Sequence, residues 1–196
     1  ERACRAFTTW FVQHFHGRER VGIVCGTGNN GGDGLGIARM LIEQGYTAVC
    51  WIIKGSMPVT PDFEVNLERA VAAGVKVFEV SAESEEVLAE SDVIVDALFG
   101  SGLTRPAEGL YAWAIERMNV VRACRVAVDI PSGLMADSPS EGVVVKADYT
   151  ITFQLPKLAF FLPQNAPFTG QWHVVEIGLS RQFIKNSETN YNYTRE

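Results

Sequence analysis

The chain has 196 residues, of which 47% are apolar and 20% charged, and its formal net charge is -6. This length and composition fit one globular domain with a substantial core. The acidic balance argues against a broadly basic surface, so a nucleic-acid partner is not expected. The longest apolar runs have the length of strands, so no membrane partner is expected either. The four cysteines lack the spacing of a metal or redox motif, which is typical of reduced, buried thiols in a cytoplasmic protein.

The first part of the chain alternates helical and strand patterns. Residues 1–16 place aromatic and apolar side chains at helical intervals, which predicts an amphipathic helix that faces the core or, alternatively, a second subunit. The expected strands that follow are Val21–Cys25, Thr47–Ile53, Val75–Val80, Val93–Phe99 and Arg125–Asp129. The expected helices run from the glycine-rich loop to about Gln44, then over Asp62–Ala73, Glu83–Glu90 and Glu108–Asn119, with Gly45 and Gly74 as stops. Alternation of helices with uninterrupted apolar strands predicts an α/β fold around a parallel sheet.

The last part of the chain has strand patterns and prolines but no convincing helix. Val143–Val145, Tyr149–Phe153 and Trp172–Ile177 are expected to extend the sheet at one edge. From about Ser180 the sequence is polar and aperiodic. We therefore expect a domain over residues 1–180 and a tail or linker over residues 181–196.

The most unusual stretch is the loop Gly26–Gly34, which carries five glycines, two asparagines and an aspartate. It lies between a strand pattern and a helix pattern. Five glycines predict a backbone that adopts positive φ and comes close to a ligand. The N terminus of the helix that follows favours a bound phosphate.

Two further loops follow predicted strand ends, at Gly100–Pro106 and Ile130–Gly133. In a parallel sheet the carboxyl ends of the strands share one edge, where ligands bind. Asp96 and Asp129 each end an apolar strand, and either caps a turn or acts in a site. The polar groups expected at this edge are Asn29, Asn30, Asp33, Asp96, Ser101, Thr104, Arg105, Asp129 and Ser132.

The segment Gly26–Gly31 satisfies the GxGxxG pattern of dinucleotide-binding proteins, but this pattern alone is weak. Its usual companion is an acidic residue at the end of the second strand, which binds the ribose hydroxyls. Here the second strand runs into Lys54. An ordinary NAD-dependent oxidoreductase is therefore disfavoured.

Four ordered motifs resemble those of the YjeF N-terminal family. They are Gly28–Gly34, Val95–Gly100 with its continuation Gly102–Pro106, Val128–Gly133 and Thr152–Lys157. The resemblance covers about residues 1–180. It implies a three-layer α/β/α sandwich with a Rossmann-like sheet, a homodimer and a bound potassium ion. It also implies epimerisation of hydrated NADH and NADPH (NADHX and NADPHX), which a fused or separate dehydratase then repairs.

The resemblance also assigns residues. By its motifs, the substrate would contact Asn29, Asn30, Gly31, Gly32, Asp33, Gly100, Ser101, Gly102, Leu103, Thr104, Arg105, Pro106, Tyr111 and Asp129. Asn30, Asp96 and Ser132 would provide oxygens to potassium, and oxygen donors suit a hard cation.

Epimerisation at C6 of the hydrated nicotinamide needs a proton-transfer group and control of water. We expect Asp129 to be the general acid/base, with Lys157 as a charge partner that tunes it or contacts phosphate. Asp33 is the second candidate for the acid/base. The alternative function is a non-catalytic binding module on the same fold.

Overall fold

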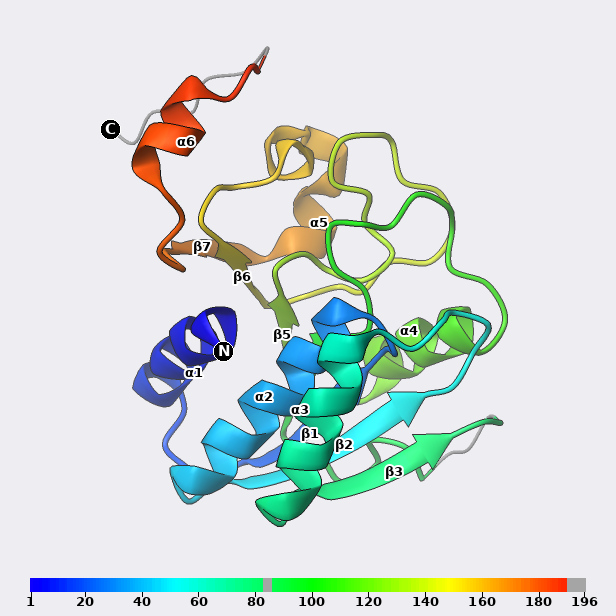
Figure 1. Ribbon diagram of the computed structural model, residues 1–196. Coiled ribbons are helices and arrows are strands. Elements are labelled where there is room, and N and C mark those ends of the chain that lie inside the picture. Colours follow the sequence, from blue (N-terminus) through cyan, green and yellow to red (C-terminus); the bar gives the residue numbers. More distant parts are fainter. Residues whose placement is uncertain (83–85, 190–196) are drawn as a thin grey trace.

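The computed structural model describes residues 1–82 and 86–189. Its centre is a seven-stranded sheet with the order β3-β2-β1-β4-β5-β6-β7, in which every neighbouring pair is parallel (Figure 1). The strands are β1 (Arg20–Cys25), β2 (Thr47–Ile53), β3 (Lys76–Val80), β4 (Val93–Ala97), β5 (Cys124–Val128), β6 (Tyr149–Phe153) and β7 (Gln171–Val175). The predicted α/β fold with a parallel sheet is confirmed.

Helices cover both faces of this sheet. The helices are α1 (Arg2–His14), α2 (Asn29–Glu43), α3 (Pro61–Ala72), α4 (Leu110–Val120), α5 (Ala166–Thr169) and α6 (Arg181–Asn186), with short 3-10 turns η1 (Leu158–Phe161) and η2 (Pro163–Asn165). Figure 1 shows α1, α2 and α3 together, and their apolar side chains form one core with the sheet. α4 packs in a separate core on the opposite face. No helix in the described part of the chain is long and apolar enough to cross a membrane.

Burial on both faces explains the continuous apolar strands in the centre of the sheet. All five residues of β4 are buried, including Asp96. The edge strand β3 instead exposes three of its five residues. The core on the α1–α3 face takes alternate strand residues such as Ile23 and Cys25, whereas Val24 points to the α4 face.

Two predicted elements are wrong within the described residues. Val143–Val145 does not form a strand. The side-chain amide of Asn119 donates to the Val144 carbonyl at 2.9 Å and accepts from the Lys146 N–H at 2.8 Å, so a side chain takes the place of a neighbouring strand. The apolar pattern there reflects burial of Val144 and Val145 in a loop.

The acidic helix predicted over Glu83–Glu90 is the second error, although residues 83–85 lie outside the described residues. Residues 86–90 form turns. Leu88 has a φ of +64°, which a helix does not allow, and its side chain packs against Gly22 of β1. The tertiary packing of Leu88 therefore overrides the weak helical preference of this segment.

The expectation of no helix in the last part of the chain is also wrong, since η1, η2 and α5 lie between β6 and β7. Other differences are small shifts at the ends of elements. Gly45 and Gly74 have φ values of +86° and +84° and lie just beyond α2 and α3, as predicted. In the stretch that was predicted to be an aperiodic tail, the short helix α6 begins after Ser180, whose side chain accepts a hydrogen bond from the Phe183 N–H.

Candidate functional site

A cleft of about 690 Å³ lies at the carboxyl edge of the sheet. The chain order reverses between β1 and β4, so the loops after these two neighbouring strands diverge and leave space between them. The cleft is lined by Thr27, Gly28, Asn29, Asn30, Asp33, Ser56, Met57, Pro58, Thr60, Leu98, Phe99, Gly100, Ser101, Gly102, Leu103, Thr104, Arg105, Tyr111, Asp129 and Phe153.

The glycines of the first loop allow close packing and do not adopt a left-handed backbone conformation. None of the five, all of them in the described residues, has a positive φ, so this expectation is wrong. A Cβ at Gly26 would lie 2.2 Å from the Leu98 carbonyl oxygen, and one at Gly31 would lie 1.8 Å from the Gly26 carbonyl oxygen. A Cβ at Gly28 would meet nothing within 4 Å. Gly26 thus packs against the chain that leaves β4 and Gly31 packs against Gly26, whereas Gly28 leaves open space beside the cleft.

Gly28 is also the N-cap of α2, and this helix end has no side-chain cap in the described structure. The positive end of the helix dipole and the first amide groups therefore lie at the cleft beside Asn29 and Asn30. This arrangement suits a phosphate group.

A polar network below the cleft joins all three predicted loops. Asp96 is fully buried at the end region of β4, and its two carboxylate oxygens accept from Ser132 Oγ at 2.6 Å and the Ser132 N–H at 2.7 Å. Ser132 Oγ in turn accepts from the Phe99 N–H at 2.8 Å. The Asn30 amide donates to the Phe99 carbonyl at 2.9 Å. Asn30, Asp96 and Ser132 thus meet around Phe99.

Burial raises the pKa of Asp96 from its ordinary value of 3.8 to about 6, although the hydrogen bonds from Ser132 and the Leu98 N–H act in the opposite direction. The groups around the carboxylate are neutral, and several of them carry oxygen atoms. Oxygen ligands fit a hard cation, and such a cation would favour the ionised form of Asp96.

The second acidic residue, Asp129, lies just after β5 with a φ of +68°. Its Oδ1 accepts from Lys157 Nζ at 2.7 Å, the Phe153 N–H at 3.1 Å and Thr152 Oγ1 at 3.3 Å. The side chains of Asp129 and Lys157 are only 12% and 17% exposed, so this ion pair is largely shielded from water. A partly buried carboxylate at a cleft, oriented by a lysine, can transfer protons.

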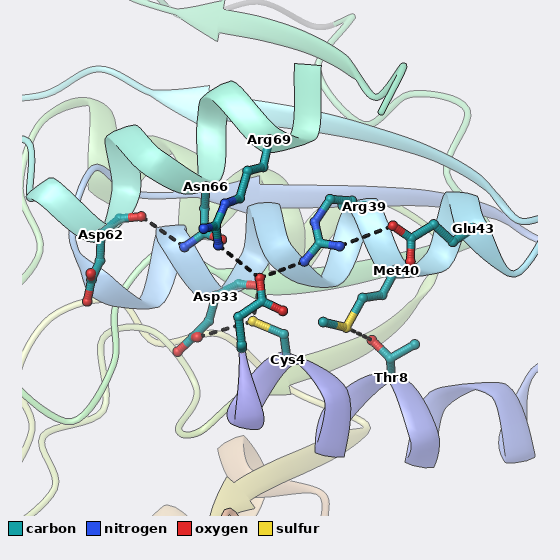
Figure 2. A network of polar contacts seen from close by, with 10 residues as sticks. Cys4, Thr8, Asp33, Arg39, Met40, Glu43, Asp62, Asn66 and Arg69 are labelled. Carbon is teal, nitrogen blue, oxygen red and sulfur yellow. Dashed lines mark hydrogen bonds and ion pairs between the residues drawn. The ribbon is translucent and has the colours of Figure 1, made fainter. Parts of the chain in front are cut away.

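Asp33, in the first part of α2, also lines the cleft. Its Oδ1 accepts from the Cys4 thiol at 3.3 Å, which ties α1 to α2, as Figure 2 shows. Burial raises the pKa of Asp33, and burial beside Asp33 raises the pKa of Cys4 to about 12. Cys4 is therefore a neutral hydrogen-bond donor to this carboxylate.

The sequence interpretation missed the wall formed by the loop after β2. Ser56, Met57, Pro58 and Thr60 line the cleft there. Thr27 Oγ1 donates toward the Met57 and Pro58 carbonyls at 3.2 and 3.3 Å, and the Met57 N–H donates to the Tyr111 hydroxyl at 3.1 Å. This wall could have been predicted, because the loop follows the carboxyl end of β2, which lies next to β1 in the sheet.

Most of the predicted substrate residues lie on the cleft, with three exceptions. Gly31 and Gly32 face protein backbone, namely Gly26 and Phe63, and Pro106 is near Gly142. Lys157 reaches the site through Asp129. A more open hollow of about 540 Å³ lies between α1 and β7, away from the three loops.

A family model described as "YjeF-related protein N-terminus" matches residues 1–159. The chain belongs to this family. In the structure the four family motifs lie together, since three of them line the cleft and the fourth contains Lys157, which binds Asp129.

The curated relatives of this chain differ in how much of their length it covers. It is 37% identical to the "NAD(P)H-hydrate epimerase" of Rhodopirellula baltica, over 83% of the chain and 68% of the relative. It is 36% identical to the protein of the same name in Limosilactobacillus fermentum, over 87% of the chain and 81% of the relative. It is 41% identical to the "Bifunctional NAD(P)H-hydrate repair enzyme Nnr" of Thermofilum pendens, over 86% of the chain but only 34% of the relative. The chain therefore spans about a third of that bifunctional relative.

Among solved structures, the crystal structure of the yeast protein ynu0 superposes with a TM-score of 0.78 at 24% identity, covering 98% of this chain and 84% of the yeast chain. This likeness supports the fold described above.

Proposed function

We propose that this chain catalyses the interconversion of the R and S forms of hydrated NADH and NADPH. The observation that carries the proposal is the cleft at the switch point, which is lined both by the glycine-rich start of α2 and by Asp129, the partner of Lys157. Relatives named NAD(P)H-hydrate epimerase, at 37% and 36% identity over most of both chains, support the same reaction.

In this proposal the cleft binds the two ends of the substrate differently. The N terminus of α2, with Asn29 and Asn30, receives the phosphates. The loop Gly100–Arg105 forms the facing wall. The hydrated nicotinamide then lies toward Asp129, which is the shielded carboxylate at the other side of the cleft.

Epimerisation breaks the C6–oxygen bond and forms it again on the opposite face of the ring. When water adds, the Asp129 carboxylate accepts a proton from the attacking water. When water leaves, the same group in its protonated form returns the proton to the departing hydroxyl. The lone pair of the ring nitrogen stabilises the cation between these steps. Within the described residues Oδ1 accepts every hydrogen bond to the Asp129 carboxylate, so in this proposal Oδ2 is the oxygen for proton transfer.

A potassium ion is also part of the proposal, with Asn30, Asp96 and Ser132 as the residues that would hold it. Their side-chain oxygens and the buried charge of Asp96 support this assignment. The ion would supply positive charge beside the loop after β4 and so order one wall of the cleft. A rise in melting temperature with KCl, but not with an equal concentration of tetramethylammonium chloride, would test it without an activity measurement.

The partners stay predictions. A homodimer would use the aromatic helix α1 or another face, and a dehydratase, fused or separate, would consume the S form. The bifunctional relatives support a fused arrangement in some family members.

The decisive experiment is epimerisation of purified R-NADHX, followed by coupling to a dehydratase that accepts only the S form. We expect the coupled rate to rise in proportion to this protein, well above the spontaneous rate. Binding of R-NADHX without any increase in rate would instead favour the non-catalytic binding module.

A further inference from the structure

Gln154 has an unusual backbone for its residue type. It follows β6 with a φ of +67°, and it is one of three non-glycine residues with positive φ in the described structure, beside Leu88 and Asp129. A left-handed backbone is unfavourable for a residue with a long side chain. Such a residue persists where the surrounding structure compensates for it.

The compensation comes from the chain that leaves β7. The side-chain oxygen Oε1 of Gln154 accepts from the N–H groups of Ile177 and Leu179, both at 3.2 Å. The backbone N–H of Gln154 donates to the Val175 carbonyl at 2.8 Å. Gln154 therefore connects the end of β6 with residues 175–179 through three hydrogen bonds.

The same turn contacts the Asp129–Lys157 pair from its other side. The Phe153 N–H donates to Asp129 Oδ1 at 3.1 Å. The carbonyls of Phe153 and Leu155 accept from Lys157 Nζ at 3.5 and 3.4 Å. Gln154 is the middle residue of this turn, so its conformation sets where both neighbours point.

We infer that Gln154 is a positioning residue for the Asp129–Lys157 pair. Its amide oxygen clamps the turn 153–155 onto the segment 176–179, and the turn holds the carboxylate and the ammonium in place. A glycine would adopt the positive φ more easily but could not make the two side-chain hydrogen bonds. Because of this clamp, a displacement of the chain after β7 would also move the proposed acid/base group. The inference rests on the proposed function for its catalytic consequence, whereas the clamp itself is a property of the protein alone.

Three substitutions separate the backbone from the side chain. Gln154→Gly favours the positive φ and removes the acceptor, and Gln154→Ala keeps the unfavourable φ and removes the acceptor. Gln154→Glu keeps an oxygen acceptor at the same reach. Gln164→Ala, on the exposed turn η2, is the control for loss of a glutamine side chain.

Each variant is measured in two ways. The first is kcat and KM for R-NADHX in the coupled assay. The second is the set of backbone amide resonances in a 1H–15N NMR spectrum, where Ile177 and Leu179 report on the clamp and Phe153 reports on its bond to Asp129.

We expect Gln154→Gly and Gln154→Ala to lower kcat by about tenfold, since a displacement of roughly 1 Å in a catalytic group can cost up to about 100-fold. We expect KM to change by less than about twofold, because Gln154 does not line the cleft. The amide resonances of Ile177, Leu179 and Phe153 should all shift. Gln154→Glu and Gln164→Ala should keep values close to those of the unaltered protein.

Two results would overturn the inference. In the first, Gln154→Gly retains full kcat, which would mean that only the backbone conformation matters. In the second, the Ile177 and Leu179 resonances shift while Phe153 does not, which would mean that the clamp does not reach Asp129. If the unaltered protein does not epimerise R-NADHX, the proposed function fails, but the Phe153 resonance still decides whether Gln154 positions the pair.

Discussion

Two walls of the cleft, formed by the loop after β1 and by the ends of β5 and β6, achieve their shapes by opposite means. The wall from the loop after β1 depends on missing side chains, because Gly26 and Gly31 lie where any Cβ would meet a carbonyl oxygen. The wall from the ends of β5 and β6 depends on side chains that stabilise a left-handed backbone at Asp129 and Gln154. The first wall is therefore a close-packed surface suited to binding. The second is held by polar side-chain contacts and contains the group proposed for proton transfer.

The largest expected effect is at the second wall. Asp129→Asn should lower kcat for R-NADHX by about 100- to 10,000-fold, because the amide cannot transfer a proton. Binding of R-NADHX, measured by calorimetry, should persist because the cleft keeps its shape. The exposed residue Asp137 offers a matched control, and Asp137→Asn should keep full activity. An active Asp129→Asn variant that still binds R-NADHX would move the acid/base role to Asp33.

Substitutions in the first wall should change the stability of the protein. Gly31→Ala should lower the free energy of unfolding by about 3 kcal/mol, since its Cβ would lie 1.8 Å from a backbone oxygen that cannot move aside freely. Gly28→Ala is the matched control, because its Cβ would meet nothing within 4 Å, and it should change stability by no more than about 1 kcal/mol. Urea denaturation measures both. Equal losses in the two variants would contradict the packing role of Gly31.

The buried carboxylate between the walls should make stability depend on pH. The pKa of Asp96 is about 6 in the folded protein, against an ordinary value of 3.8. The folded state therefore binds the proton more tightly, and the free energy of unfolding should fall as pH rises from about 4 to about 6, by up to about 3 kcal/mol.

The variant Asp96→Asn tests this pH dependence, because it should lose that part of the slope. A bound potassium ion favours the ionised carboxylate, so KCl should make the slope smaller than tetramethylammonium chloride does. An identical slope in Asp96→Asn and the unaltered protein would show that another group is responsible.

The smallest expected effect concerns the loop after β2. Tyr111→Phe removes the hydroxyl that accepts from the Met57 N–H, at a cost of about 1 kcal/mol. We expect KM to rise about fivefold with little change in kcat, because this loop lines the cleft without touching Asp129. Tyr149→Phe, within the aromatic cluster around Trp10, is the control and should leave KM unchanged. A fall in kcat for Tyr111→Phe would show that the loop after β2 is coupled to the wall that contains Asp129.

Sequence patterns alone predicted the parallel sheet, the succession of strands and helices along the chain and the three loops of the cleft. Continuous apolar strands, helical periodicity and glycine stops are local patterns, and strands, helices and turns follow from local spacing. The ordered motifs singled out Asp96, Asp129 and Lys157 through their resemblance to the family, and these residues lie in the last part of β4, just after β5 and shortly after β6.

Contacts between residues far apart in the sequence became visible only in the folded structure. The glycines of the first loop adopt ordinary φ values, and their role became visible only through contacts with Leu98 and Gly26. Cys4 and Asp33 are 29 residues apart, and Tyr111 and Met57 are 54 apart. The proposed positioning role of Gln154 depends on its hydrogen bonds with Ile177 and Leu179, which follow β7. Such pairs follow from the packing of whole elements, which a local pattern does not encode.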